Sequence, residues 1–440
     1  MKRLLILLTV VLLLAGAVMM ASLARQREWT TDSSAALREF ELGLEARMKY
    51  YQSEALEHFQ KAAALDPEFA AAKLYVLFHH RDHRQREELR DELRQVDLEQ
   101  LTPRERFLLE FNIAQWDRDF DRARELGSTY VAEHPDDPFG LATLADLVWS
   151  EQDWNESERL YRELLEVAPN WVTAQNRLGY IALARGRFAD AEEQFETYSY
   201  IAPDQANPHD SMGELLVLLG RYDEARAEFE RALAIRPDFC DAYQHLIDLV
   251  LMDGEPAEGE QILTRAAEHC SPRMVESLRC SIVIWDDFIT GNAERVWSDE
   301  REDCRRQIGE YHFLLHRTAA KTGRVKIAER AERGLGRRIE AAEEAQHVRL
   351  DFPRALLLHM EGTRLLTEER FEEAAEAFDA ADDLLLYWGE GQGILKLYNR
   401  MNLAYALERL GRPEEAARTL EEVRRVNEDF ASSYPQSVAM

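Results

Sequence analysis

The chain has 440 residues, of which 46% are hydrophobic and 31% charged, and its few glycines and prolines favour helices over strands or disorder. Its 54 lysines and arginines are outnumbered by 83 aspartates and glutamates, so the net charge is −29. This charge would repel phosphates and anionic lipid surfaces, which argues against nucleic acid as a partner and leaves a basic protein or peptide as an attractive one. The same charge also serves simply to keep a large helical surface soluble.

The first predicted element is a hydrophobic helix over residues 4–24, which follows Met1, Lys2 and Arg3 and contains no charged residue. At 1.5 Å per residue it spans roughly 31 Å, the thickness of a bilayer core. We predict a transmembrane anchor over residues 1–24. The alternative is a cleaved signal peptide, for which Ala15-Gly16-Ala17 and Ser22-Leu23-Ala24 offer cleavage sites.

The distribution of positive charge around this helix indicates its orientation. Lys2, Arg3 and the amino terminus precede the helix, and Arg25 and Arg27 follow it, which leans toward an N-terminus in the cytoplasm. The body is then extracytoplasmic, in the periplasm, on a single-pass membrane protein. If the segment is a signal, the product is instead an exported soluble protein.

A repeat of 34 residues follows a predicted linker, residues 25–35. Within residues 206–239, small residues stand at places eight and twenty, glycine at fifteen, aromatic residues at seventeen and twenty-four, and proline at thirty-two. The residues at these places are Gly213, Gly220, Tyr222, Ala225, Phe229 and Pro237. Small residues let two antiparallel helices approach, the large residue at twenty-four fills the space between them, and glycine at fifteen can end the first helix with φ > 0.

This pattern resembles the tetratricopeptide repeat family. The resemblance implies an all-α fold: a right-handed superhelical solenoid of antiparallel helix pairs that must stack on their neighbours. Counting by 34 predicts seven in-phase units over 36–273, divergent helical pairs over 274–352, tetratricopeptide-like repeats over 353–430 and a tail, 431–440. In the third unit Gly127 stands where the large residue is expected.

The divergent pairs are predicted from pattern alone. One pair comprises helices over 274–290 and 292–307 around Gly291, and the next comprises helices over 310–322 and 324–345 around Gly323. Residues 388–391 predict a turn because they contain two glycines.

In the family, places two, five, nine, twelve and thirteen of each unit line a concave groove, and here they imply an aromatic half followed by an acidic half. The groove residues implied are Phe40, Phe78, Asn112, Trp116, Phe139, Trp149, Asn176, Tyr180, Asp210, Glu214, Asp241 and Asp248. A partner protein or peptide with apolar and basic segments would fit such a groove. The alternative is that the aromatic residues pack as core and that the acidic residues form a solvated face.

Four cysteines lie in the later part of the chain. Cys240 and Cys270 occupy places one and thirty-one of one unit, at the same end of a helix pair, so a disulfide between them is geometrically possible. Cys280 and Cys304 could form a second one. Buried free thiols are the alternative, and the even count fits an oxidising compartment.

The chain contains no phosphate-binding loop, nucleophile elbow or zinc-protease motif, and the repeats leave no room for a catalytic domain. We therefore predict no enzymatic activity, no cofactor and no metal site. The predicted function is a membrane-tethered scaffold or adaptor that presents its groove to a partner protein. The alternative is the sensory or regulatory arm of a bacterial signalling system that acts through a separate effector chain.

Overall fold

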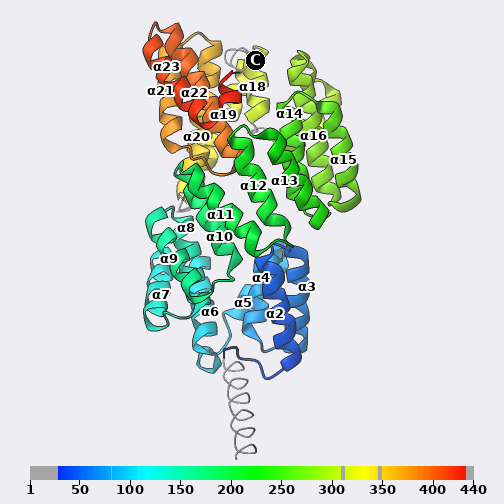
Figure 1. The fold of residues 1–440 in the computed structure, drawn as a ribbon, viewed down its shortest axis with the longest axis vertical. Coiled ribbons are helices and arrows are strands. Elements are labelled where there is room, and N and C mark those ends of the chain that lie inside the picture. Colours follow the sequence, from blue (N-terminus) through cyan, green and yellow to red (C-terminus); the bar gives the residue numbers. More distant parts are fainter. Residues whose placement is uncertain (1–27, 81, 309–312, 345–348, 433–440) are drawn as a thin grey trace, which may run out of the picture. The chain divides into compact units, whose positions relative to one another are not determined.

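The computed structural model describes residues 28–80, 82–308, 313–344 and 349–432 (Figure 1). The chain divides into two compact units, one up to Ala174 and one from Gln175 onward. The predicted membrane helix, residues 4–24, lies outside the described residues, as does most of the predicted tail. Among the described residues, no helix combines the length and the apolar character that crossing a membrane requires.

In the first unit, each predicted 34-residue repeat contains two helices. They are α2 (Ser34–Met48), α3 (Gln52–Leu65), α4 (Ala70–His79), α5 (His83–Leu93), α6 (Pro103–Trp116), α7 (Phe120–Glu133), α8 (Pro138–Ser150) and α9 (Trp154–Val167), with a short 3-10 helix, η1 (Leu98–Gln100). Side chains at the N-caps fix several starts. Asp82, Thr102 and Asp153 each accept a hydrogen bond from the backbone N–H three residues later, which satisfies a donor that the helix leaves free.

The second unit continues these pairs and then departs from them. Its helices are α10 (Val172–Ala184), α11 (Phe188–Ile201), α12 (Ala206–Leu218), α13 (Tyr222–Ile235), α14 (Cys240–Met252), α15 (Pro256–His269), α16 (Pro272–Ile289), η2 (Ala293–Trp297), η3 (Asp299–Arg301), α17 (Glu302–Ile308), α18 (Phe313–Lys321), α19 (Val325–Glu344), α20 (Asp351–Thr367), α21 (Phe371–Leu384), α22 (Gly389–Arg409), α23 (Pro413–Val426) and α24 (Glu428–Ser432).

Glycine and phenylalanine fit together at the centre of several helix pairs. A Cβ added to Gly43 would lie 2.5 Å from the ring of Phe59, and one added to Gly362 would lie 2.7 Å from the ring of Phe378. Both rings are fully buried. Because no real Cβ approaches another carbon so closely, only glycine lets the two helices close on the ring.

The third repeat exchanges the two members of this contact. Phe111 occupies the place that is usually small, and Gly127 occupies the place that is usually large. A Cβ at Gly127 would lie 3.6 Å from the Phe111 ring and 2.9 Å from Leu144. One large residue therefore still fills the space, supplied by the first helix instead of the second.

In six of the seven in-phase repeats, the turn inside the pair has a residue with positive φ at place fifteen. Gly186, Gly220 and Gly254 occupy this place in three repeats. In three others the residues are Tyr50, Arg118 and Gln152, with φ between 57° and 62°. A side chain in this conformation costs about 1 kcal/mol relative to glycine, so these turns are imposed by the packing of the pair.

The predicted helix over 292–307 is wrong. The segment forms η2, η3 and α17 in its place, with an extended backbone at Ser298. Two interactions favour this path. Arg301 forms an ion pair at 2.6 Å with the buried Asp287, and Arg305 donates to the backbone carbonyls of Val296 and Ser298. The predicted turn over 388–391 is also misplaced, because Gly389 already begins α22.

In the second unit the C-terminal helices fold back onto α12. A Cβ at Gly393 of α22 would lie 2.9 Å from Leu218 of α12. Near the end of the chain, Asn427 donates hydrogen bonds to the carbonyl of Val217 and to the hydroxyl of Tyr222. Residues more than 200 positions apart thus share one core, and part of α12 is covered by the chain itself.

The strained turn at Gln152 gives a direct test of the packing. Replacing Gln152 with glycine removes the cost of the positive φ, and we expect the free energy of unfolding to rise by about 1 kcal/mol. The Gln60→Gly variant is the control. Gln60 is exposed in the middle of α3, where glycine should lower stability by about 1 kcal/mol. Urea unfolding measures the free energy of unfolding of both variants. A loss of stability in both, at position 152 as well as at position 60, would contradict this account.

Candidate functional site

The first helices of successive repeats contact one another within each unit. In the first unit α4 contacts α6 and α6 contacts α8, and in the second unit α12 contacts α14 and α14 contacts α16. The residues implied as groove residues therefore stand on shared walls, one wall in each unit. Their accessibility differs from what the sequence pattern implied.

Phe40 is part of the core and does not line a groove. Its side chain is 0% exposed, and its ring lies 4.9 Å from that of Phe69 and 5.3 Å from that of Tyr75, measured between centroids. A partner cannot contact a fully buried ring, so Phe40 stabilises the stack of helices.

Trp29 covers Phe40, and sequence reasoning missed it. This residue lies in the segment predicted to be a linker, yet it is buried, with its ring 4.8 Å from Phe40 and 5.1 Å from Phe139. The guanidinium of Arg104 lies 5.2 Å from the Trp29 ring and 4.7 Å from the Phe139 ring. In the sequence, the signal for this buried position was a tryptophan that stands among charged residues ahead of the first helix.

The residues next to Trp29 are held by polar contacts. Thr30 donates its backbone N–H to Glu105, and Thr31 donates its hydroxyl to Asp66. Glu105 is buried, and burial raises the pKa of its carboxyl. The chain itself therefore fills part of the aromatic wall in the first unit.

The other groove candidates of the first unit divide into core and surface. Trp149 is 6% exposed and packs against Trp154, and Asn112 is buried and donates to the backbone carbonyl of Leu108 in its own helix.

Phe78 is 41% exposed. Trp116 is half-buried, with the guanidinium groups of Arg90 and Arg94 at 5.7 and 5.8 Å from its ring. Phe78 and Trp116 therefore form the accessible part of this wall, together with the half-buried Phe139.

The second unit brings Asp210 and Glu214 of α12 together with His245 of α14. The Nδ1 atom of His245 lies 2.9 Å from a carboxylate oxygen of Asp210, and Nε2 lies 4.0 Å from one of Glu214. Tyr180 donates its hydroxyl to Glu214 at 2.9 Å. Asn176, which is buried, donates to Ser211 at 2.8 Å.

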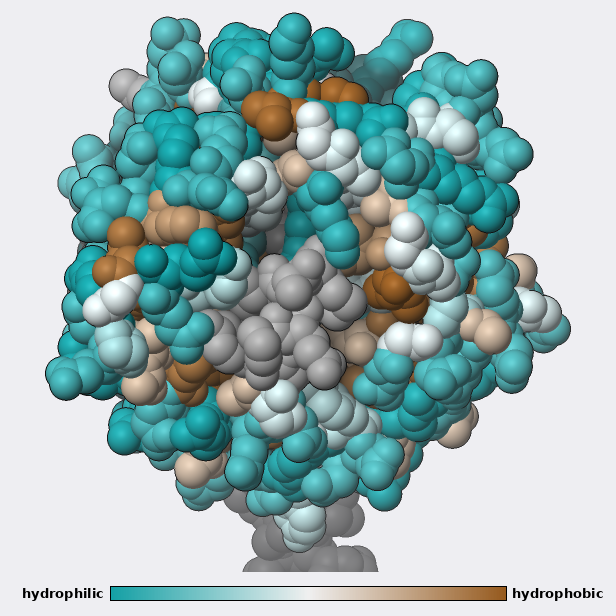
Figure 2. All heavy atoms as spheres, turned by 90° about the horizontal axis from the view of Figure 1, so that it is seen from above, coloured by the Kyte–Doolittle hydropathy of each residue, from teal (hydrophilic) through white to brown (hydrophobic). Residues whose placement is uncertain are grey.

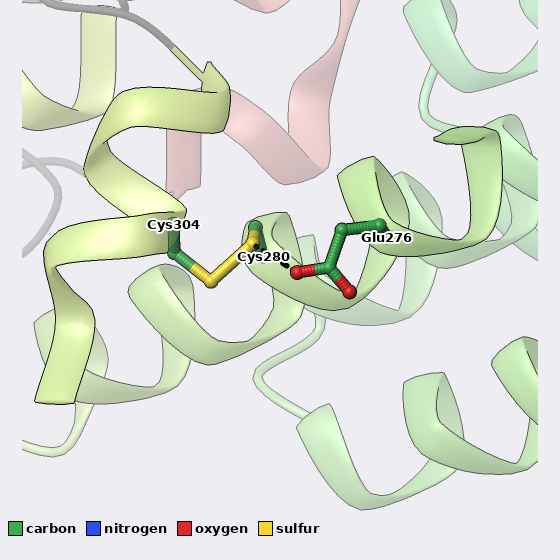
Figure 3. A group of neighbouring side chains, drawn as sticks. All are labelled: Glu276, Cys280 and Cys304. Carbon is green, nitrogen blue, oxygen red and sulfur yellow. Dashed lines mark hydrogen bonds between the residues drawn. A yellow bond between two sulfur atoms is a disulfide. The ribbon is translucent and has the colours of Figure 1, made fainter. Parts of the chain in front are cut away.

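This cluster has the donor atoms for a divalent cation, because one atom from each of Asp210, Glu214 and His245 lies within 4.8 Å of the others. The hydrogen bond between His245 and Asp210 accounts for the same proximity without an ion. A second group, Glu276 with Cys280 and Cys304, is a weaker candidate, because its two sulfur atoms are joined in a disulfide (Figure 3).

Two further carboxylates extend the acidic wall along α14. Asp241 is exposed, and Asp248 is half-buried and accepts a hydrogen bond from Gln244 at 2.7 Å. Burial raises the pKa of Asp248 to about 6. Although Asp241 is exposed to solvent, desolvation by neighbouring atoms and the charge of Asp210 raise the pKa of its carboxyl as well. A carboxylate whose charged form is disfavoured by burial is stabilised by a positively charged ligand.

The C-terminal segment lies against this wall too. A Cβ at Gly389 would lie 3.0 Å from a carboxylate oxygen of Glu214. The face viewed in Figure 2 is mostly hydrophilic, with hydrophobic residues in scattered patches. On α14, Asp241 is exposed and Asp248 is half-buried, so the accessible acidic surface lies on this helix, with Gln244 between the two carboxylates in the sequence.

The structure pairs all four cysteines. Cys240 and Cys270 form one disulfide, with their Cα atoms 5.8 Å apart, and Cys280 and Cys304 form another, with theirs 4.9 Å apart. The first disulfide closes the base of the pair α14–α15. The second ties α17 to α16.

Residues 172–238 and 216–269 match the tetratricopeptide repeat family. The chain therefore contains tetratricopeptide repeats, and such repeats generally mediate protein–protein interaction and are typically non-catalytic. The comparison with curated proteins found no match.

Several solved structures are similar to the chain. A tetratricopeptide repeat protein from Parabacteroides merdae is 17% identical, with 69% of this chain and 98% of that chain covered and a TM-score of 0.40. MamA from Desulfovibrio magneticus is 15% identical over 38% of this chain and 93% of its own, with a TM-score of 0.33. PilW, a type IV pilus biogenesis factor, is 14% identical over 44% and 94%, with a TM-score of 0.35.

The raised pKa of Asp248 leads us to predict that the stability of the folded chain depends on pH. Because its folded-state pKa is about 6 and that of an unfolded aspartate is near 4, the folded chain binds the proton more tightly and loses stability as pH rises between about 4 and 6. Asparagine cannot ionise. We expect the Asp248→Asn variant to match the parent near pH 4 and to exceed it at pH 7 by on the order of 1–3 kcal/mol.

Thermal unfolding across this pH range measures the effect, with the exposed Asp204→Asn as control. A gap between Asp248→Asn and the parent that stayed constant from pH 4 to pH 7 would contradict the assignment.

Proposed function

We propose that the chain is a protein-binding scaffold that receives a partner protein or peptide on its first helices. The observation that carries this proposal is the presence of tetratricopeptide repeats over 172–269, in which the first helix α14 carries the exposed Asp241 and the half-buried Asp248. A scaffold needs a stable, repetitive surface and no catalytic group, and the stacked pairs provide that surface.

The partner surface has a defined chemistry in each unit. In the second unit Asp241 and Asp248 favour lysine or arginine side chains, because burial disfavours their charged forms and a nearby cation would stabilise them. In the first unit Phe78 and Trp116 offer apolar area. A partner with basic and apolar segments fits both chemistries. The proposed surface is smaller than the full groove that the repeat pattern implied, because Trp29 and the C-terminal helices occupy parts of it.

Site-specific photocrosslinking tests the proposal. A photoreactive residue placed at position 78 or 241 of the full chain, expressed in native cells, should yield a discrete adduct with a partner. The same residue at position 200 is the matched control, because Tyr200 is 86% exposed but lies on a second helix. High salt should weaken the adduct at position 241 more than the one at 78, because salt screens charge pairs. Adducts at position 200 alone, or equal yields at all three, would contradict the assignment of the surface.

We further propose that residues 4–24 tether this scaffold to a membrane with its body in the periplasm. The length and apolar character of the segment support the tether, and the two disulfides fit an oxidising compartment.

Fractionation tests this placement. The full chain should stay with the membrane after alkaline carbonate extraction. Its four cysteines should resist a maleimide reagent until a reductant is added, and protease applied to spheroplasts should remove the body. A chain that is released by carbonate but keeps its disulfides would indicate the cleaved-signal alternative. A protected body with reactive thiols would place it in the cytoplasm.

A further inference from the structure

A cleft of about 530 Å³ lies in the divergent middle of the second unit. Three arginines line it, Arg305 and Arg306 of α17 and Arg330 of α19, together with the apolar side chains of Trp297, Leu315 and Ile327. The chain carries a net charge of −29, so a cleft with three arginines and one lining carboxylate, Glu302, has the opposite local charge.

The arginines differ in how their charges are compensated. Arg306 forms ion pairs with Glu302 and Asp303. Arg305 donates to the backbone carbonyls of Val296 and Ser298, which holds its guanidinium in place but leaves its charge without a carboxylate among the described residues. Arg330 likewise forms no ion pair with any residue in the described ranges. The charges of Arg305 and Arg330 are therefore not neutralised by a carboxylate of the described residues, and both side chains line the cleft, where they could bind an anion.

The cleft also offers apolar surface beside the arginines, from Trp297, Leu315 and Ile327. The guanidinium of Arg305 lies 5.8 Å from the ring of Trp297, which orients the ring at the edge of the cleft. The indole N–H of Trp297 is buried and has no acceptor among the described residues.

We propose that this cleft binds a small anion carried on an apolar or aromatic body, with the anionic group as a carboxylate or a phosphate. One guanidinium group can bind either anion through two parallel N–H bonds, and the apolar side chains that line the cleft would contact the body. The site lies outside the repeats that carry the proposed partner surface. It gives the divergent middle a ligand-binding role of its own.

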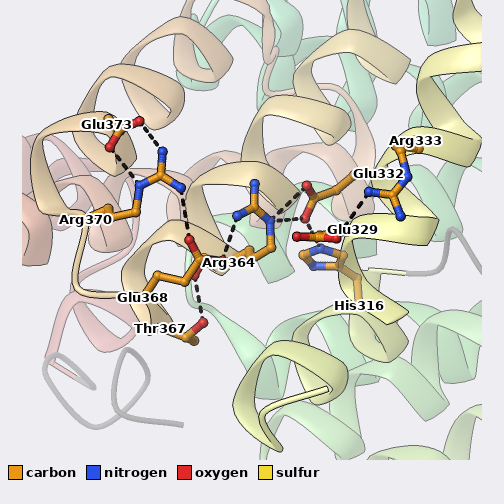
Figure 4. A network of polar contacts seen from close by, with 9 residues as sticks. All are labelled: His316, Glu329, Glu332, Arg333, Arg364, Thr367, Glu368, Arg370 and Glu373. Atoms are coloured by element: carbon orange, nitrogen blue, oxygen red, sulfur yellow. Dashed lines mark hydrogen bonds and ion pairs between the residues drawn. The ribbon is translucent and has the colours of Figure 1, made fainter. Parts of the chain in front are cut away.

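Two cross-links hold the cleft in shape. The disulfide between Cys280 and Cys304 ties α17 to α16 immediately before Arg305 (Figure 3). On the other side His316, which also lines the cleft, lies 2.9 Å from Glu332, and Glu332 accepts two hydrogen bonds from Arg364 (Figure 4). Because α17 is short and the disulfide fixes its start, reduction should loosen the arginines and weaken binding.

Isothermal titration calorimetry of the full chain, purified in mild detergent, tests the proposal. The probes are phenyl phosphate, phenylacetate, inorganic phosphate and phenol. We expect one saturable site for at least one of the two anionic aromatic probes, weaker binding of inorganic phosphate and no binding of phenol. The stronger of the two aromatic probes identifies the anionic group.

The Arg330→Gln variant should weaken binding about tenfold or more, because it removes a charge-assisted hydrogen bond from an arginine that supports no backbone contact. Arg122→Gln is the control, since Arg122 is exposed and paired with Glu125 on α7. The proposed site would be overturned if no probe showed saturable binding. It would also be overturned if the parent and Arg330→Gln bound the probe with equal affinity.

The disulfide is tested separately. The Cys280→Ser/Cys304→Ser variant should bind more weakly, and the Cys240→Ser/Cys270→Ser variant, which removes the distant disulfide, should bind as the parent does. Unchanged affinity in the first variant would overturn the role of the disulfide and leave the anion site standing.

Discussion

The structure depends on one constraint: a pair of helices cannot bury its own apolar face and must be closed by a neighbour. Within a pair, closure is achieved by volume matching. A glycine on one helix admits a phenylalanine ring from the other, as Gly43 does for Phe59. The exchange of Phe111 and Gly127 shows that the space must be filled, whichever helix supplies the ring. The turn at Gln152 accepts an unfavourable φ for the same reason.

The constraint also acts at the ends of a stack, where no further repeat covers the apolar surface. In the first unit Trp29 covers Phe40. In the second unit the C-terminal helices cover part of α12, with Asn427 bonded to Val217. These contacts reduce the surface that a partner can reach. The proposed function therefore rests on the side chains that remain accessible, Phe78 and Trp116 in one unit and Asp241 and Asp248 in the other.

The local features of this fold could be predicted from the sequence, because they repeat every 34 residues. The spacing of Gly213, Gly220 and Phe229 predicts where two helices and a turn lie, and helices stand there. The features that define the site depend on single residues far apart in the chain. No periodic signal links Asn427 to Val217, and nothing in the pattern indicates that a tryptophan ahead of the first repeat is buried. The path of residues 292–307 depends on the ion pair between Arg301 and Asp287, which pattern alone does not reveal.

A double-mutant cycle on the exchanged pair tests the volume-matching claim most directly. Phe111→Gly leaves a cavity and Gly127→Phe overfills the pair, so each single change should lower the free energy of unfolding by roughly 2–5 kcal/mol. Combining them restores the arrangement of the other repeats. The account predicts that the double variant loses less than the sum of the single losses, by at least about 1 kcal/mol. Losses that simply add would contradict the claim that one ring filling one space holds each pair together.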